Sequence, residues 1–117
     1  MVENTLLTGK KILIVDDEPD VLDTLADLLA DYITIKALSF DEAKAILDTQ
    51  IIDIAILDIM GVAGYDLLQL TTEKGITSVM LTAHALSPEN VIKSYKGGAS
   101  FYIPKEEMVR IESFLED

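Results

Sequence analysis

Apolar and polar residues follow two different spacing patterns along this chain. Short runs rich in β-branched residues, such as Lys11–Val15, recur between longer stretches in which apolar residues are spaced three or four apart. Within Pro19–Asp31, the valine and the leucines fall on one helical face and the four aspartates fall on the other. The short β-branched runs predict buried strands, and the spacing of three or four residues predicts amphipathic helices.

Five units of strand and helix can be placed in this way. We predict strands over Lys11–Val15, Tyr32–Ala37, Asp53–Leu57, Thr77–Leu81 and Ser100–Ile103. We predict helices over Pro19–Asp31, from the capping box Ser39–Glu42 to about Thr49, over Gly64–Lys74, from N-cap Ser87 to about Gly97-Gly98, and over about Glu106–Leu115. Strict alternation indicates an α/β protein whose parallel sheet is covered on both faces by helices.

The composition of the strands also suggests their places in the sheet. The apolar runs of the first, third and fourth strands are typical of central strands that are buried on both faces. Pro104 has no backbone N–H to donate, so the fifth strand is expected at an edge.

The chain has 117 residues, the size of a single domain. We expect a flexible leader over residues 1–9 and one domain over residues 10–117. No apolar run approaches the roughly 20 residues that a membrane span needs, and the start of the chain lacks the apolar core of a signal peptide. The absence of cysteine excludes disulfides and thiolate metal sites, and these features together favour a cytoplasmic location.

The formal net charge is −12 at pH 7. Such an acidic surface repels nucleic acid and anionic lipid headgroups, because both carry negative charge. We therefore expect no direct nucleic-acid partner and no membrane insertion. Proteins with basic patches and divalent cations are the partners that this charge favours, and keeping the protein soluble is the alternative role for most of the acidic residues.

Reactive side chains gather where the predicted strands end. Those ends carry, in chain order, Asp16-Asp17-Glu18, Asp58, Thr82 and Lys105. Ligands of open α/β sheets bind beyond the carboxyl ends of the strands, so these groups are expected to meet at one site. Crowded carboxylates repel one another unless a cation is present, and Mg²⁺ prefers such oxygen ligands. A lysine and a hydroxyl can bind phosphate oxygens, so the site is suited to phosphoryl transfer onto a carboxylate.

These residues resemble the receiver domains of response regulators in two-component signalling. The matching segments, in order, are ILIVDDEPDVLDTL (Ile12–Leu25), IAILDIM (Ile54–Met60), VMLTAHA (Val79–Ala85) and GGASFYIPK (Gly97–Lys105). The resemblance implies a flavodoxin-like doubly wound sheet with strand order 2-1-3-4-5. It also implies phosphoryl transfer from a histidine kinase or a phosphotransfer protein, and a signalling domain rather than an enzyme.

Carried over position by position, the resemblance makes Asp58 the phosphoacceptor and Mg²⁺ the cofactor. Asp17 and Asp58 would bind the metal directly, and Asp16 would act mostly through water. The backbone carbonyl of Met60 would be the third protein ligand. The alternative for Asp16 and Asp17 is that they only cap the first helix.

The same resemblance assigns a switch. Thr82 and Lys105 would be the pair that senses the phosphoryl group, and Tyr102 would be the aromatic residue that changes rotamer when Thr82 moves. The face made by the fourth helix, fifth strand and fifth helix would be the output face. A plain half-buried aromatic is the alternative for Tyr102, and Val91 and Tyr95 are expected to be core contacts of the fourth helix rather than a partner patch.

Two positions depart from the family pattern. The family usually has a proline after the acceptor segment and a glycine eight positions past the aspartate, whereas Gly64 follows Asp58 by six and no proline intervenes. We expect a loop about two residues shorter, which alters the geometry of the Met60 carbonyl. The family also has a cis-proline after the lysine; Glu106 stands there instead, and a trans bond is expected because a cis one costs about 3 kcal/mol.

Two other functions remain open at this point. One is a pseudo-receiver, an interaction module that is never phosphorylated and binds Mg²⁺ weakly or not at all. The other is a small Mg²⁺-dependent phosphatase with an aspartyl-phosphate intermediate, which is disfavoured because such hydrolases carry Asp-x-Asp after the first strand and usually a cap domain. Here the first strand is followed by Asp16-Asp17-Glu18.

Overall fold

The computed structural model describes residues 10–59, 62–83 and 88–116 of the chain. Strands and helices alternate along it, as the sequence predicts for an α/β protein. The strands are β1 (Lys11–Val15), β2 (Ile33–Ala37), β3 (Ile54–Asp58), β4 (Thr77–Thr82) and β5 (Phe101–Pro104). All five predicted strands are confirmed, and their ends shift by one residue at most.

The strands form one parallel sheet in the order β2-β1-β3-β4-β5, which confirms the predicted fold class. The apolar strands β1, β3 and β4 are central, and the strand that ends in Pro104 lies at an edge. In the sheet register Val15 is paired with Leu57, and Thr82 is paired with Pro104. The residues that follow these pairs therefore leave the sheet at the same edge.

The helices are α1 (Pro19–Leu28), α2 (Phe40–Thr49), α3 (Gly64–Glu73), α4 (Pro88–Lys96) and α5 (Ile111–Glu116). The predicted end of the first helix at Asp31 is wrong, because the chain turns earlier. The backbone N–H of Tyr32 donates to the carbonyl of Leu29 at 3.0 Å, and the Tyr32 hydroxyl donates to Glu112 of α5 at 2.9 Å. This early turn brings a buried tyrosine across to the C-terminal helix.

The capping box at the start of α2 is confirmed. Ser39 Oγ accepts a hydrogen bond from the backbone N–H of Glu42 at 3.2 Å. The Glu42 carboxylate accepts one from the N–H of Leu38 at 2.7 Å, one residue before the usual position. The predicted N-cap of α4, Ser87, lies outside the described residues.

The predicted last helix is wrong in its first half. Residues Lys105–Arg110 form a 3₁₀ helix, η1, and only Ile111–Glu116 are α-helical. In a 3₁₀ helix, side chains three residues apart lie on the same side. Met108 packs against the core beside α1 and Ile111 is fully buried there, so the tighter winding keeps both on the core while the chain leaves β5. No described peptide bond is cis, which confirms the trans bond expected after Lys105.

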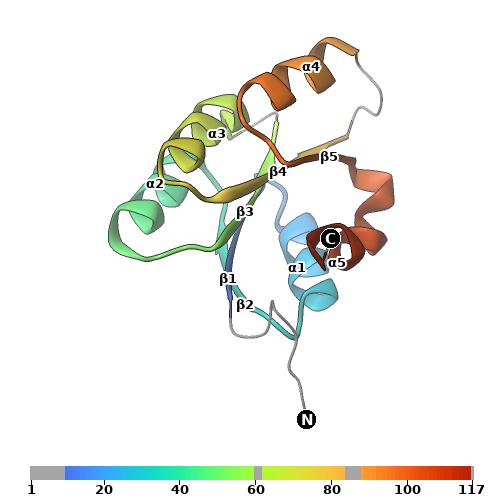
Figure 1. Cartoon of the computed structure of the whole chain (residues 1–117). Coiled ribbons are helices and arrows are strands. Elements are labelled where there is room, and N and C mark those ends of the chain that lie inside the picture. The colour runs from blue at the N-terminus through green and yellow to red at the C-terminus, as the bar shows by residue number, and fades with distance from the viewer. Residues whose placement is uncertain (1–9, 60–61, 84–87, 117) are drawn as a thin grey trace.

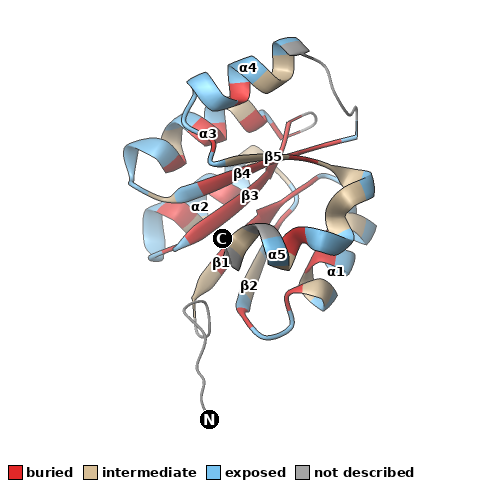
Figure 2. Cartoon of the chain, turned by 45° about the vertical axis from the view of Figure 1, so that its right-hand side comes forward, coloured by how far each residue is buried: buried red, intermediate tan, exposed pale blue. Residues whose placement is uncertain are grey.

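The helices cover both faces of the sheet, as Figure 1 shows: α1 and α5 on one face, α2 and α3 on the other. Each face has its own cluster of buried apolar residues. Figure 2 shows the central strands as largely buried and α4 as largely exposed or intermediate. Within the described residues, no helix has the length and apolar character needed to cross a membrane.

Candidate functional site

The site lies at the carboxyl edge of the central strands, where the sheet register brings four predicted residues together. Asp16 directly follows β1 and Asp58 ends β3, while Thr82 ends β4 and Lys105 follows β5. Asp16, Asp58 and Thr82 are almost completely buried, with 0%, 4% and 2% of their surface exposed. Buried polar groups at one sheet edge are costly unless they meet partners, so the arrangement needs an explanation beyond folding.

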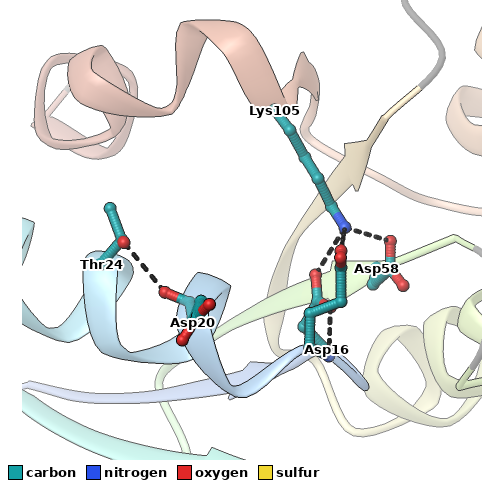
Figure 3. Close-up of polar contacts among 6 residues, drawn as sticks. Asp16, Asp20, Thr24, Asp58 and Lys105 are labelled. Carbon is teal, nitrogen blue, oxygen red and sulfur yellow. Dashed lines mark hydrogen bonds and ion pairs between the residues drawn. The ribbon is translucent and has the colours of Figure 1, made fainter.

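Lys105 is the centre of this cluster (Figure 3). Its Nζ lies 2.9 Å from Asp16 Oδ2, 3.0 Å from Glu18 Oε1 and 3.4 Å from Asp58 Oδ1. The lysine side chain is itself only 16% exposed. The ammonium of Lys105, which follows edge strand β5, therefore contacts residues at the ends of β1 and β3. Its partner Glu18 is 87 residues away in the sequence.

Asp16 is held in place from two sides. Its backbone N–H donates to the carbonyl of Ala37 at 3.1 Å, and its Oδ1 accepts from the N–H of Glu18 at 2.9 Å. Its Oδ2 is buried and, within the described chain, accepts no well-aligned hydrogen bond, so its near contact is the ion pair with Lys105. A buried carboxylate oxygen with one imperfect partner can accept a further cation.

The contact made by Glu18 was not among the sequence-based predictions. This residue is the N-cap of α1, yet its side chain makes no capping hydrogen bond. It reaches Lys105 instead, and 63% of its side chain stays exposed. Serine, threonine or aspartate would cap the helix better, and this poor choice of cap was the available signal that Glu18 serves another purpose.

Burial and crowding perturb the acid–base behaviour of the site. Burial, followed by the charge of Asp16, raises the pKa of Asp58 from 3.8 to about 6, although Lys105 pulls in the opposite direction. Burial alone would lower the pKa of Lys105, but its close contacts with the carboxylates of Asp16, Glu18 and Asp58 outweigh burial and raise that pKa. At neutral pH the lysine is charged and Asp58 is largely ionised.

The backbone after Asp58 is tightly packed. A Cβ atom on Gly64 would overlap the carbonyl oxygen of Asp58 and lie 2.8 Å from the Cα of Ile59, so only glycine fits there. Ala63, just before it, adopts the left-handed conformation with φ of 55°, which is unfavourable for a residue with a Cβ. The start of α3 is therefore sterically constrained. The predicted metal ligand Met60 lies outside the described residues.

Tyr102 occupies a position suited to its predicted role, but its movement stays a prediction. It lies in β5 opposite Met80 and is half-buried against the core cluster on the α2 and α3 side of the sheet. Thr82 ends the neighbouring strand two residues beyond Met80.

The donor set fits a divalent cation. Carboxylate oxygens of Asp16, Asp17 and Glu18 lie within 4.8 Å of one another, and Asp58 adds a further carboxylate nearby. Four carboxylates thus lie near one another and one ammonium contacts three of them, so the excess negative charge favours a cation that prefers oxygen ligands, such as Mg²⁺. Asp17 is exposed, so the cluster can be reached from solvent.

Comparisons with known proteins point to one family. The family model of the response regulator receiver domain matches residues 12–114. The heme response regulator HssR of Staphylococcus saprophyticus is 34% identical over 115 residues, an alignment that covers 89% of this chain and 50% of the relative. The chain thus spans about half the length of that curated relative.

Solved structures give the same picture of the fold. A CheY-like response regulator receiver domain protein from Methanospirillum hungatei JF-1 is 28% identical with a TM-score of 0.77, and the match covers 92% of this chain and 95% of that one. A response regulator from Thermotoga maritima is 21% identical with a TM-score of 0.80, covering 93% and 99% of the two chains.

Proposed function

The chain belongs to the response regulator receiver domain family, and we propose that it accepts a phosphoryl group on Asp58 with the help of a bound Mg²⁺. Receiver domains are signalling domains of two-component systems rather than enzymes, and the family implies a histidine kinase or phosphotransfer protein as partner. The observation that carries the proposal is the position of Lys105, whose ammonium meets both Asp16 and Asp58 at the carboxyl edge of the sheet.

Asp58 would act as the nucleophile. One of its carboxylate oxygens attacks the phosphorus of a phosphohistidine, the phosphorus–nitrogen bond breaks, and its electron pair stays on the imidazole nitrogen of the donor. A pKa of about 6 leaves Asp58 mostly ionised at neutral pH and more basic than an ordinary aspartate. Its burial excludes bulk water from the reacting oxygen, which favours transfer over hydrolysis.

Two other side chains would bind the transferred group. Lys105 is close enough to Asp58 to place its positive charge beside the phosphoryl oxygens. The hydroxyl of Thr82, at the end of the neighbouring strand, would donate a hydrogen bond to one of them. Thr82 ends β4 and Lys105 directly follows β5, so both groups lie at the carboxyl edge where charge would develop.

The carboxylates of Asp16, Asp17 and Asp58 would hold the metal, with the Met60 carbonyl as the predicted further ligand. When bound, Mg²⁺ supplies neutralising charge to the phosphoryl oxygens. A bound cation would also offset the repulsion between Asp16 and Asp58 that raises the pKa of the acceptor.

We further propose that phosphorylation shifts a two-state equilibrium. Thr82 would move toward the phosphoryl group, Tyr102 would fill the vacated space, and the face made by α4, β5 and α5 would change shape. The position of Tyr102 in β5, beside the strand that ends in Thr82, supports this proposal.

Phosphorylation by a small-molecule donor tests the proposed acceptor. Wild-type protein incubated with acetyl phosphate and Mg²⁺ should gain the mass of one phosphoryl group, and EDTA should abolish the gain. Asp58→Asn should gain nothing, whereas Asp66→Asn, which changes an exposed aspartate on α3, should behave as wild type. A wild type that stays unmodified, or an Asp58→Asn variant modified equally well, rules out Asp58 as acceptor.

A Mg²⁺ titration separates the proposed receiver from a pseudo-receiver. The amide resonances around Asp16 and Asp58 should shift saturably as Mg²⁺ is added, and Asp17→Asn should weaken binding at least tenfold because it removes a ligand charge. A pseudo-receiver would show no saturable shift.

A further inference from the structure

Helix α4 is attached to the rest of the molecule differently from the other helices. The helices α1, α2, α3 and α5 each contribute buried apolar side chains to a core cluster, whereas none of the described side chains of α4, residues 89–96, belongs to either cluster. Tyr95 is 49% exposed and Ile92 is 54% exposed, so the expectation that Tyr95 is a core contact is wrong. Val91 is partly buried but belongs to neither cluster. Apolar burial therefore contributes little to holding α4 in place.

The one fully buried side chain described on α4 weakens its attachment further. Ser94 is 0% exposed, and its hydroxyl has no hydrogen-bond partner within the described chain. A buried hydroxyl without a partner disfavours the conformation that buries it. Among the described residues, polar contacts to α3 are therefore an important part of what holds this helix.

Those contacts come from Tyr65 in the first turn of α3. Its hydroxyl lies 2.9 Å from Asn90 Oδ1 and 3.3 Å from the Asn90 backbone carbonyl, so it can donate to either. The Lys93 ammonium sits 4.3 Å from the centre of the Tyr65 ring, a cation–π contact. The ring also packs against the core cluster below it, which fixes the position of the hydroxyl.

The other end of α4 is attached to the same face of α3. Thr72 Oγ1 donates to the carbonyl of Gly97 at 3.2 Å, and a Cβ on Gly97 would lie 2.8 Å from a methyl carbon of Leu68. Tyr65, Leu68 and Thr72 are spaced three and four apart and so share one face of α3. Gly98 has φ of 109°, so the chain turns sharply just after this anchor.

Tyr65 is also the residue next to the acceptor segment. It follows Gly64, whose backbone packs directly against that of Asp58 and Ile59. We propose that Tyr65 is a latch: it holds the first turns of α4 against α3 and relays the position of the Asp58 segment to α4, with the Gly97 end as the fixed anchor. Tyr65 is a positioning residue in this scheme, because it does not touch the reacting atoms.

The proposal deepens the function proposed above and rests on it for one consequence. If phosphorylation favours a moved α4, the latch stabilises the unphosphorylated state, and breaking the latch lowers the barrier to switching. Removing the Tyr65 hydroxyl should therefore make Asp58 easier to phosphorylate without changing the reacting groups.

Hydrogen exchange tests the latch without any phosphorylation. In metal-free protein, Tyr65→Phe should speed amide exchange in α4 about fivefold, the effect of one lost hydrogen bond, and leave α2 unchanged. Tyr95→Phe, which removes an exposed hydroxyl from α4 itself, is the matched control and should exchange as wild type. Unchanged exchange of α4 in Tyr65→Phe overturns the latch.

Asn90→Ala provides a double-mutant cycle. Because Tyr65 and Asn90 share one interaction, the double variant should exchange no faster than the faster of the two single variants. Fully additive effects on α4 exchange would show that the two residues act independently and would also overturn the latch.

Phosphorylation by acetyl phosphate tests the relay. Tyr65→Phe should be phosphorylated about two to five times faster than wild type, while Tyr95→Phe matches wild type. Equal rates for Tyr65→Phe and wild type overturn the relay. If wild type itself takes no phosphoryl group, the proposed function fails and the relay falls with it, whereas the exchange results still decide whether the latch exists.

Discussion

At the scale of single residues, the raised pKa of Asp58 makes the stability of the folded protein depend on pH. The pKa of its carboxyl is 3.8 when unperturbed and about 6 in the folded protein. Between these values the folded state holds a proton that the unfolded state has released. The stabilisation from this carboxyl is therefore complete below pH 3.8 and is lost as pH rises through about 6.

Replacing Asp58 by asparagine should remove this pH dependence. In EDTA above pH 7, Asp58→Asn should be more stable than wild type by up to roughly 3 kcal/mol, since a tenfold change in an ionisation constant corresponds to about 1.4 kcal/mol. Urea unfolding across the acid range measures the difference, which should shrink toward pH 4. A difference between the two proteins that does not vary with pH contradicts the assignment.

Ala63 offers a second residue-scale prediction. It adopts φ of 55°, where a Cβ is unfavourable, so Ala63→Gly should stabilise the protein by about 1 kcal/mol. Ala45→Gly, in the middle of α2 on its exposed side, should destabilise by about the same amount. Chemical unfolding compares the two variants, and opposite signs are the expected result.

Much of the site could be predicted because the end of a strand can be recognised from the neighbouring residues in the sequence. Three of the predicted strands stop one residue before Asp16, Asp58 or Thr82, and parallel strands bring these ends to one edge of the sheet. The contact between Glu18 and Lys105 could not be predicted, because the partner of a long exposed side chain depends on which residues the fold brings near it. The strain before α3 and the close packing of its first glycine likewise depend on backbone placed by the rest of the fold.

At the scale of secondary structure, local sequence patterns predict where helices begin better than where they end. The capping box at Ser39 is confirmed because its hydrogen bonds join neighbouring residues. The early end of α1 accompanies a contact of Tyr32 with Glu112, and η1 packs Met108 against a core made by remote residues. No pattern within either segment encodes those distant partners.

The capping box yields a prediction of its own. Ser39→Ala should destabilise the protein by about 1 kcal/mol, because the N–H of Glu42 loses its acceptor. Thr24→Ala removes a hydroxyl that bonds within α1, to the carbonyl of Asp20, and should change stability by less than about 0.5 kcal/mol. Denaturant unfolding of the two variants should separate a cap from an interior hydroxyl; equal losses would contradict the capping role.

At the scale of the whole molecule, the order of the strands follows from alternation together with the family resemblance, and the structure confirms it. The uneven attachment of the helices was not foreseen. The apolar positions of α4 predict a helix with a buried face, yet its described side chains stay outside both core clusters and polar contacts hold it to α3. Amphipathic periodicity shows that a helix has an apolar face but not that the fold buries it.

The overall charge leads to the last prediction. A net charge of −12 at pH 7 destabilises the compact state by self-repulsion, which dissolved salt screens. The melting temperature should therefore rise with NaCl, and Mg²⁺ at equal ionic strength should raise it further because it binds the folded site and not the unfolded chain. Asp17→Asn should lose most of the Mg²⁺ increment and keep the NaCl response, whereas Asp27→Asn, an exposed change on α1 outside the carboxylate cluster, should keep both. If Mg²⁺ and NaCl act alike on wild type at equal ionic strength, the carboxylates act only as diffuse surface charge, and the metal-assisted part of the proposed function is wrong.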